Sequence, residues 1–219
     1  MDVVLSQRLV VLQGGPGTGK TSTVSRMLQA VLERDPSCRV ELAAPTGKAA
    51  ARLRAATEGL YPCGTLHRLL ESRGDHFGRT RTNPLRLDLL VVDEVSMVDL
   101  ALMEALLEAL PGAARLVLVG DPAQLPPISP GALLLELQHP DIQACLAGAL
   151  ITLTTTYRNN GAIAAVANAL RAVIASGVGL GGGEPLALIR SYLEGLTAGD
   201  NLRWRCVTDN RLQIGRAHV

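Results

Sequence analysis

The stretch of sequence that decides the fold is Leu9–Thr21, which reads Leu-Val-Val-Leu-Gln-Gly-Gly-Pro-Gly-Thr-Gly-Lys-Thr. A short apolar run leads directly into the pattern G-x-x-x-x-G-K-[ST], which spans Gly14 to Thr21. An amphipathic helical pattern follows, with one apolar face made by Val24, Met27, Leu28, Val31 and Leu32. This order of strand, glycine-rich loop and helix is the context in which the pattern binds phosphate, and it disfavours a fortuitous glycine-rich turn. We therefore predict a phosphate-binding loop carried by a parallel sheet.

The residue types in this loop each have a chemical reason. Glycines let the backbone wrap so that successive N–H groups face the phosphates, and the start of the next helix adds the positive end of its dipole. Lys20 would reach the β- and γ-phosphates, and the Thr21 hydroxyl would be a ligand of Mg²⁺. The predicted nucleotide-binding residues are Gly14, Gly15, Pro16, Gly17, Thr18, Gly19, Lys20, Thr21 and Ser22.

Further short apolar runs occur along the chain, each followed by a cluster of polar residues, glycine or proline. Together with Leu9–Gln13 they are Val40–Ala44, Leu89–Val92, Leu116–Val119 and Ile151–Leu153, and helical patterns such as Leu100–Leu110 and Ala162–Ala175 lie among and after them. Strands that alternate with helices predict a parallel sheet with helices on both faces, and ligands of such sheets bind at the carboxyl ends of the strands. The fold class predicted is therefore α/β, of the P-loop NTPase type.

Two of these runs end in residues suited to nucleotide hydrolysis. Asp93 follows the third run and is placed to hold Mg²⁺, while the adjacent Glu94 is a candidate base for the attacking water. Gln124 follows the fourth run and could contact both a γ-phosphate oxygen and that water. A solvated acidic turn and an ordinary Gly-Asp-Pro turn are the respective alternatives. The sequence has no Asn-Lys-x-Asp guanine-recognition motif, so ATP is the expected nucleotide.

The composition excludes several classes of protein. In 219 residues the charge is nearly balanced at +1, so binding of anions must be local rather than general. Only Lys20 and Lys48 are lysines among the 21 basic residues, and the rest are arginines. The four cysteines are scattered without metal-ligand spacing, and neither an 18-residue apolar run nor a signal-peptide pattern is present. We expect a cytoplasmic protein without a membrane segment, disulfide framework or zinc site.

Six motifs occur in the order found in one helicase family. They are Gly14–Thr21, Ala44–Ala50 (Ala-Pro-Thr-Gly-Lys-Ala-Ala), Thr65–Leu70 (Thr-Leu-His-Arg-Leu-Leu), Val91–Asp99, Val119–Pro126 and Thr156–Asn159 (Thr-Tyr-Arg-Asn). In this the chain resembles the RecD-like superfamily-one DNA helicases, the alpha subunits of exodeoxyribonuclease V. The resemblance implies a RecA-like ATPase domain that uses ATP and Mg²⁺ to move 5′ to 3′ along DNA, with RecB and RecC as partners in repair and recombination at double-strand breaks.

The resemblance also implies residue roles. Lys20, Thr21, Asp93, Glu94 and Gln124 keep the roles above, and Arg158 matches an arginine that reaches the γ-phosphate. A surface arginine on a turn is the alternative for Arg158. The candidate DNA contacts are Thr46, Lys48, Thr65 and His67, because they match segments that touch phosphates of single-stranded or duplex DNA. Lys48 as a solvated residue and His67 as a hydrogen-bonded core histidine remain open.

The expected domain organisation is a RecA-like P-loop ATPase domain in residues 1–157, a helix and glycine-rich linker in 158–183, and a remnant of a second domain in 184–219. The chain is expected to be truncated at both ends, with a non-native tail at Ile214–Val219. By itself it is expected to bind ATP weakly and not to unwind DNA. A nucleotide-binding or interaction module without helicase activity, and another P-loop enzyme such as a kinase, are the alternatives.

Overall fold

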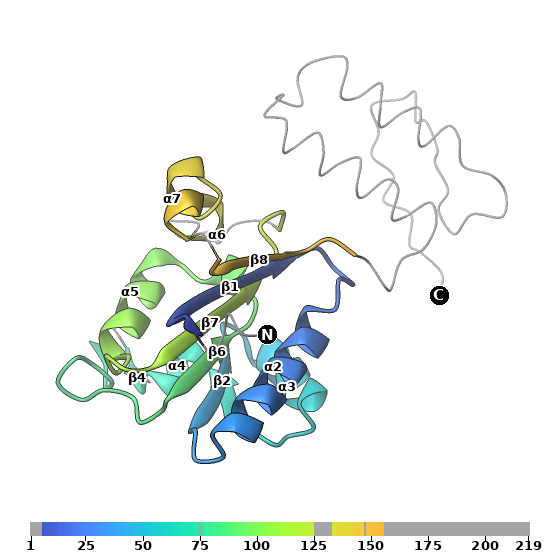
Figure 1. Ribbon diagram of the computed structural model, residues 1–219. Helices are drawn as coiled ribbons and strands as arrows, with labels where there is room; N and C mark the ends of the chain where they lie inside the picture. The colour runs from blue at the N-terminus through green and yellow to red at the C-terminus, as the bar shows by residue number, and fades with distance from the viewer. Residues whose placement is uncertain (1–5, 75, 125–132, 147, 156–219) are drawn as a thin grey trace, which may run out of the picture. The chain divides into compact units, whose positions relative to one another are not determined.

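The computed structural model describes residues 6–74, 76–124, 133–146 and 148–155. Its centre is a six-stranded sheet in the order β3-β2-β6-β7-β1-β8, and every neighbouring pair in it is parallel (Figure 1). The strands are β1 (Leu9–Gly14), β2 (Val40–Ala44), β3 (Cys63–Thr65), β6 (Leu89–Val92), β7 (Arg115–Gly120) and β8 (Leu150–Leu153). A separate antiparallel pair joins β4 (Ser72–Arg73) to β5 (His76–Phe77).

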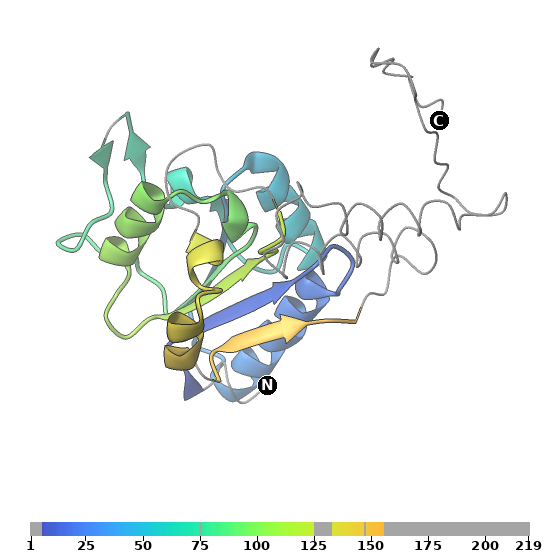
Figure 2. The same cartoon turned by 90° about the horizontal axis from the view of Figure 1, so that it is seen from above.

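Helices cover both faces of the sheet, as the two views show (Figures 1 and 2). One face carries α2 (Lys20–Arg34) and α3 (Gly47–Ala56), whose buried residues pack with those of the strands in one cluster. The other face carries α4 (Leu66–Leu69), the 3₁₀ turn η1 (Val95–Met97), α5 (Leu100–Ala109) and α6 (Leu133–Glu136). The short helix α7 (Pro140–Cys145) leads back to β8. The predicted α/β class, with a parallel sheet between two helical layers, is confirmed.

Alternation along the strands explains the two layers of core. In β1, Val10 and Leu12 pack toward α2 and α3, whereas Val11 packs toward α5, and all three are at most 1% exposed. Such strands read as continuous apolar runs because both of their faces are buried. Because the strands are parallel, the polar residues that follow them lie together at the carboxyl end of the sheet.

The structure adds elements that the apolar runs did not reveal. The sheet has a sixth strand, β3, which pairs Cys63 with Leu42 and Thr65 with Ala44. This strand is only three residues long and contains Gly64, so it carries little apolar pattern. Helix α2 begins at Lys20 and ends at Arg34, slightly beyond the predicted face, and β7 includes Arg115 and Gly120 at its ends. The predicted helix Ala162–Ala175 lies outside the described residues.

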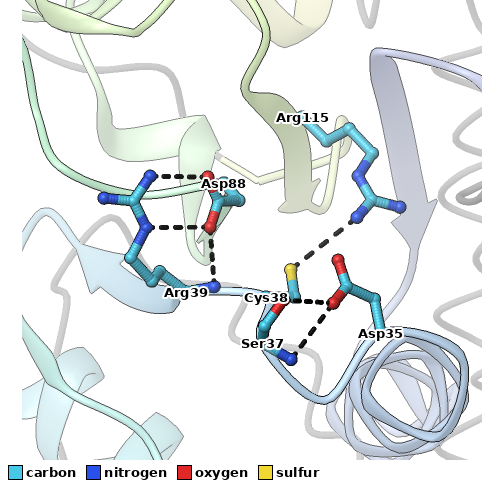
Figure 3. Close-up of polar contacts among 6 residues, drawn as sticks. All are labelled: Asp35, Ser37, Cys38, Arg39, Asp88 and Arg115. Atoms are coloured by element: carbon cyan, nitrogen blue, oxygen red, sulfur yellow. Dashed lines mark hydrogen bonds and ion pairs between the residues drawn. The ribbon is translucent and has the colours of Figure 1, made fainter.

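The amino-terminal edge of the sheet is held by polar contacts (Figure 3). The Asp88 carboxylate accepts from the Arg39 guanidinium at 2.7 and 2.9 Å and from its backbone N–H at 2.9 Å, and these bonds lower the pKa of Asp88 to about 2. Nearby, Arg115 donates to the Cys38 sulfur at 3.7 Å, although burial raises the pKa of that thiol. These contacts join the residues just before β2 and β6 to the first residue of β7, at the end of the sheet opposite the phosphate loop.

The chain divides into two compact units, residues 1–158 and 159–219. All the described residues belong to the first unit. The predicted boundaries at 157/158 and 183/184, and the predicted tail, remain predictions.

Candidate nucleotide and DNA site

The phosphate loop connects β1 to α2 at the carboxyl end of the sheet. Gly17 and Gly19 have φ angles of 77° and 82°, in the left-handed region that favours glycine. The Thr18 hydroxyl donates to the Gly15 carbonyl at 2.8 Å, which closes a tight turn inside the loop. The loop therefore leads the chain directly into the start of a 15-residue helix, where free backbone N–H groups and the helix dipole favour an anion.

Lys20 is the first residue of α2, and its side chain lies along the loop. Its Nζ donates to the carbonyl oxygens of Gly14 at 2.6 Å and of Gly15 at 3.0 Å. These bonds hold the ammonium group beside the backbone that would surround the phosphates. Next along α2, Thr21 is partly buried and Ser22 is exposed.

Asp93 and Glu94 follow β6, and the Asp93 backbone N–H donates to the Ala43 carbonyl at 2.9 Å. Burial is the main cause that raises the pKa of the Asp93 carboxyl, and the charge of Glu94 adds to it. The Glu94 backbone N–H, which donates to Asp93 Oδ1 at 2.9 Å, and the charge of Lys20 oppose this rise in pKa. The structure thus brings Lys20 and Asp93 within electrostatic reach, although they are far apart in sequence.

Glu94 adopts a backbone conformation that costs energy. Its φ and ψ are 54° and 41°, the left-handed region, which costs a residue with a Cβ about 1–2 kcal/mol. The η1 turn begins directly after it, so the strained residue marks a sharp change of direction at the end of β6. Strain of this kind is often kept where the direction of a side chain matters for function.

Gln124 lies in the turn after β7 and is exposed. Its Oε1 accepts from the Ser96 hydroxyl at 3.2 Å, and Ser96 is buried in the η1 turn two residues after Glu94. The turn itself is closed by Asp121, which accepts from the backbone N–H of Ala123 at 3.0 Å. Gln124 is therefore tied to the segment that carries the candidate base.

The candidate DNA contacts lie at the ends of two neighbouring strands. Thr46 follows β2 and caps α3 by accepting from Ala49 N–H at 3.2 Å, and Thr65 ends β3 and caps α4 by accepting from Arg68 N–H at 3.2 Å. In each threonine the hydroxyl oxygen accepts a hydrogen bond from its own helix, and its O–H remains available as a donor to a phosphate oxygen.

Lys48 and His67 are exposed on these two helices. Because His67 is exposed, the alternative of a core histidine is wrong. Its ring lies beside that of Phe77, with centroids 6.5 Å apart. Within the described part of the chain, Lys48 makes no side-chain hydrogen bond or ion pair, as expected of a solvated residue or a phosphate contact. Arg158 lies outside the described residues.

Sequence reasoning missed a pocket at the β3 edge. It has a volume of about 410 Å³ and is lined by arginines from separate segments, namely Arg54, Arg68, Arg79 and Arg86, together with Glu41 and Glu71. Arg79 is paired with Glu71 at 2.7 Å, and Arg54 donates to the Cys63 carbonyl. Burial raises the pKa of Glu41. No motif joins these residues, and only the fold brings them together.

Comparison with known proteins agrees with this geometry. A family model described as an AAA domain matches residues 1–130. The RecBCD enzyme subunit RecD of Mycolicibacterium smegmatis is 46% identical over 192 residues, covering 77% of this chain and 34% of that protein. The ATP-dependent RecD2 DNA helicase of Deinococcus radiodurans is 45% identical over 158 residues, covering 72% of this chain and 21% of that protein. The chain thus spans about a third or less of the length of these curated relatives.

Two solved structures share the fold. The Pif1 helicase of Candida albicans matches with a TM-score of 0.54 and 24% identity over 76% of this chain and 41% of that one. Bacteroides sp Pif1 in complex with ADP-AlF4 matches with a TM-score of 0.52 and 20% identity over 85% of this chain and 46% of that one. Within the described residues, no helix has the length and apolar character needed to cross a membrane. From the family model and the phosphate loop at the end of β1, we conclude that the chain belongs to the AAA domain family.

Proposed function

We propose that this chain is the ATP-hydrolysing motor domain of a RecD-like DNA helicase. The proposal rests mainly on one observation: Lys20, which follows the phosphate loop, lies close enough to Asp93, after the end of β6, for its charge to affect the pKa of the Asp93 carboxyl, and Glu94 is adjacent to Asp93. A cation for the phosphates and a buried carboxylate at one edge of the sheet are the parts that nucleotide hydrolysis requires. The similarity to RecD and to the RecD2 DNA helicase supports DNA as the polymer along which the motor moves.

In this mechanism the loop binds and orients ATP. Backbone N–H groups of Gly15 and of residues 17–20, at the start of α2, would surround the phosphates, whereas Pro16 has no N–H to donate. Lys20 Nζ would exchange its carbonyl partners for β- and γ-oxygens. The donor set fits Mg²⁺, because the Thr21 hydroxyl and the Asp93 carboxylate are oxygen ligands. When bound, Mg²⁺ neutralises charge on the phosphates.

Two further residues would handle the attacking water. Glu94 would accept its proton, and Gln124, held by the Ser96 hydroxyl, would orient it toward the γ-phosphate. Arg158 is proposed to stabilise the charge that develops in the transition state. Thr46, Lys48, Thr65 and His67 are proposed to contact DNA phosphates in a sequence-independent way.

The wider setting is part of the same proposal. We propose that the parent protein moves 5′ to 3′, acts in the cytoplasm in double-strand-break repair, and assembles with RecB and RecC. The RecD similarity supports these partners, and the sequence also fits a stand-alone relative such as RecD2.

The test is binding of a fluorescent ATP analogue with Mg²⁺. Lys20→Ala is expected to weaken binding by about 10- to 100-fold, the range for losing hydrogen bonds from a charged donor. Arg26→Ala, which removes an exposed cation from the same helix, is the matched control and should bind like the wild type. Equal binding by Lys20→Ala, or equal losses in both variants, would contradict the nucleotide site.

A second experiment tests the proposed DNA contacts and uses Lys48, the second lysine of the chain. Lys48→Ala is expected to weaken binding of single-stranded DNA and to reduce the slope of log K against log salt by about 0.7, the value for one phosphate contact on a single strand. An unchanged slope would remove Lys48 from the proposed DNA surface.

A further inference from the structure

A pair of amide side chains, the buried Gln13 and the half-buried Gln138, adjoins the phosphate loop and has no part in the mechanism above. Gln13 ends the apolar run of β1 and is only 5% exposed. Its Oε1 accepts from Gln138 Nε2 at 2.8 Å, while its own Nε2 faces Gln138 Oε1 at 3.4 Å and donates to Thr152 Oγ1 at 3.0 Å. A buried amide bound on both of its ends is fixed in orientation, because losing either partner would leave a desolvated polar atom.

Gln138 belongs to the segment that follows α6. Its Nε2 also donates to the Leu134 carbonyl at 3.0 Å, so its position follows that of α6. Leu134 is 3% exposed and packs so closely on Gly120 that a Cβ there would overlap its Cδ1. Helix α6 also packs on the η1 turn, which begins after Glu94. One short segment therefore contacts the ends of β1 and β7 and the η1 turn that follows β6.

Gln13 in turn adjoins the group that holds Lys20. The next residue is Gly14, whose carbonyl accepts from Lys20 Nζ at 2.6 Å. The Gly14 backbone packs closely on β8, because a Cβ built on it would lie 2.9 Å from the Leu153 carbonyl. The Gly14 carbonyl therefore keeps its orientation toward Lys20 as long as the end of β1 stays in place, and the Gln13 side chain anchors that end to Gln138 and Thr152.

We infer that Gln13 and Gln138 are positioning residues. Through them the position of the α6 segment determines the position of the Lys20 ammonium group. The inference deepens the proposed function, since it rests on Lys20 as the phosphate ligand. It connects the η1 turn, whose Ser96 hydroxyl bonds to Gln124, with the phosphate loop, because α6 packs on η1 and Gln138 bonds to Gln13.

The experiment uses the fact that the chain has only two lysines, Lys20 and Lys48. In the nucleotide-free chain, the rate at which an amine-reactive ester labels Lys20 is measured by peptide mass spectrometry relative to exposed Lys48. Gln138→Met, which keeps length but removes the hydrogen bonds, is expected to raise the Lys20/Lys48 ratio about three- to tenfold, the range for one net hydrogen bond. Gln29→Met is the matched control, because Gln29 bonds only with Glu33 on the exposed face of α2.

A second measurement separates positioning from stability. The double variant Gln13→Met/Gln138→Met removes both partners, so thermal stability should return toward that of the wild type. The labelling ratio should stay raised in the double variant, because Lys20 is still not positioned, and both the single and the double variant should bind the fluorescent ATP analogue more weakly than the wild type. Recovery of the labelling ratio together with stability, or an unchanged ratio in Gln138→Met, would overturn the inference. A wild type that binds no ATP would refute the proposed function, while the labelling ratio still decides the role of the amide pair.

Discussion

Replacing Gly14 by alanine would place a methyl group where the phosphate loop meets β8. The new Cβ would lie 2.6 Å from Thr18 Oγ1, 2.9 Å from the Leu153 carbonyl oxygen and 3.1 Å from Leu153 Cβ. The carbonyl belongs to the backbone, and the Thr18 hydroxyl is already bound to Gly15, so neither atom can easily turn away. Inserting one methyl group into such a site typically costs about 1–3 kcal/mol.

Part of this cost is offset in the unfolded chain. Alanine has less conformational freedom than glycine, which stabilises the folded state by about 0.4–1 kcal/mol where the backbone permits it. Gly14 has no positive φ, so this gain applies. We expect a net loss of about 1–2 kcal/mol in the free energy of unfolding, or roughly 2–8 °C in Tm for a chain of this size.

The assay is urea unfolding followed by circular dichroism, with Gly47→Ala as the matched control. Gly47 begins α3 and is exposed, and a Cβ added to it would meet no atom within 4 Å, so alanine there should stabilise the chain by up to about 1 kcal/mol. The two glycine variants should therefore shift the urea midpoint in opposite directions. If Gly14→Ala is as stable as the wild type, the close packing of the loop on β8 is refuted.

Two further predictions concern ionisable groups. Because the pKa of Asp93 is raised by burial, its charge destabilises the fold above that pKa; Asp93→Asn should raise Tm at pH 7, and the gain should vanish as the pH falls to about 3.8 and below. Thermal melts across this range test it, and a lower Tm at pH 7 would contradict it. The pKa of Asp88 is lowered from 3.8 to about 2, so its pairing with Arg39 stabilises the fold above pH 3.8 and is lost as the pH falls toward 2. Because the Asp88 side chain is 42% exposed, Asp88→Asn should cost only about 0.5–1 kcal/mol at neutral pH, and a urea midpoint that does not change there would argue against the pair.

The strands that carry the site can be predicted from the sequence because they are buried on both faces. Leu9–Gln13 and Leu89–Val92 have no polar residue on either face before their ends, so each run and the residues after it stand out. Strand β3 does not stand out, since Cys-Gly-Thr has neither length nor pattern.

The arrangement around the site depends on contacts between distant residues. In the sequence Gln13 is only the last residue of an apolar run, and its partner Gln138 lies more than a hundred residues away. The cap of Thr46 is suggested by its place before a helix, whereas the αL conformation of Glu94 has no sequence signal, because glutamate rarely adopts it. Local patterns predict elements, and side-chain partners across the sheet come only with the fold.

The strand order also has a consequence for how the chain folds. Of the described strands, β1 comes earliest in the sequence, yet its neighbours in the sheet are β7 and β8, which pair Leu9 with Leu116 and Val11 with Leu150. Pairing between such distant segments is slow, and an apolar strand without neighbours is prone to aggregate during synthesis. The segment Leu9–Gly14 can therefore pair with its neighbouring strands only after most of the described chain has left the ribosome. The phosphate loop begins at the end of this strand, so nucleotide binding would report that β1 has paired with β7 and β8.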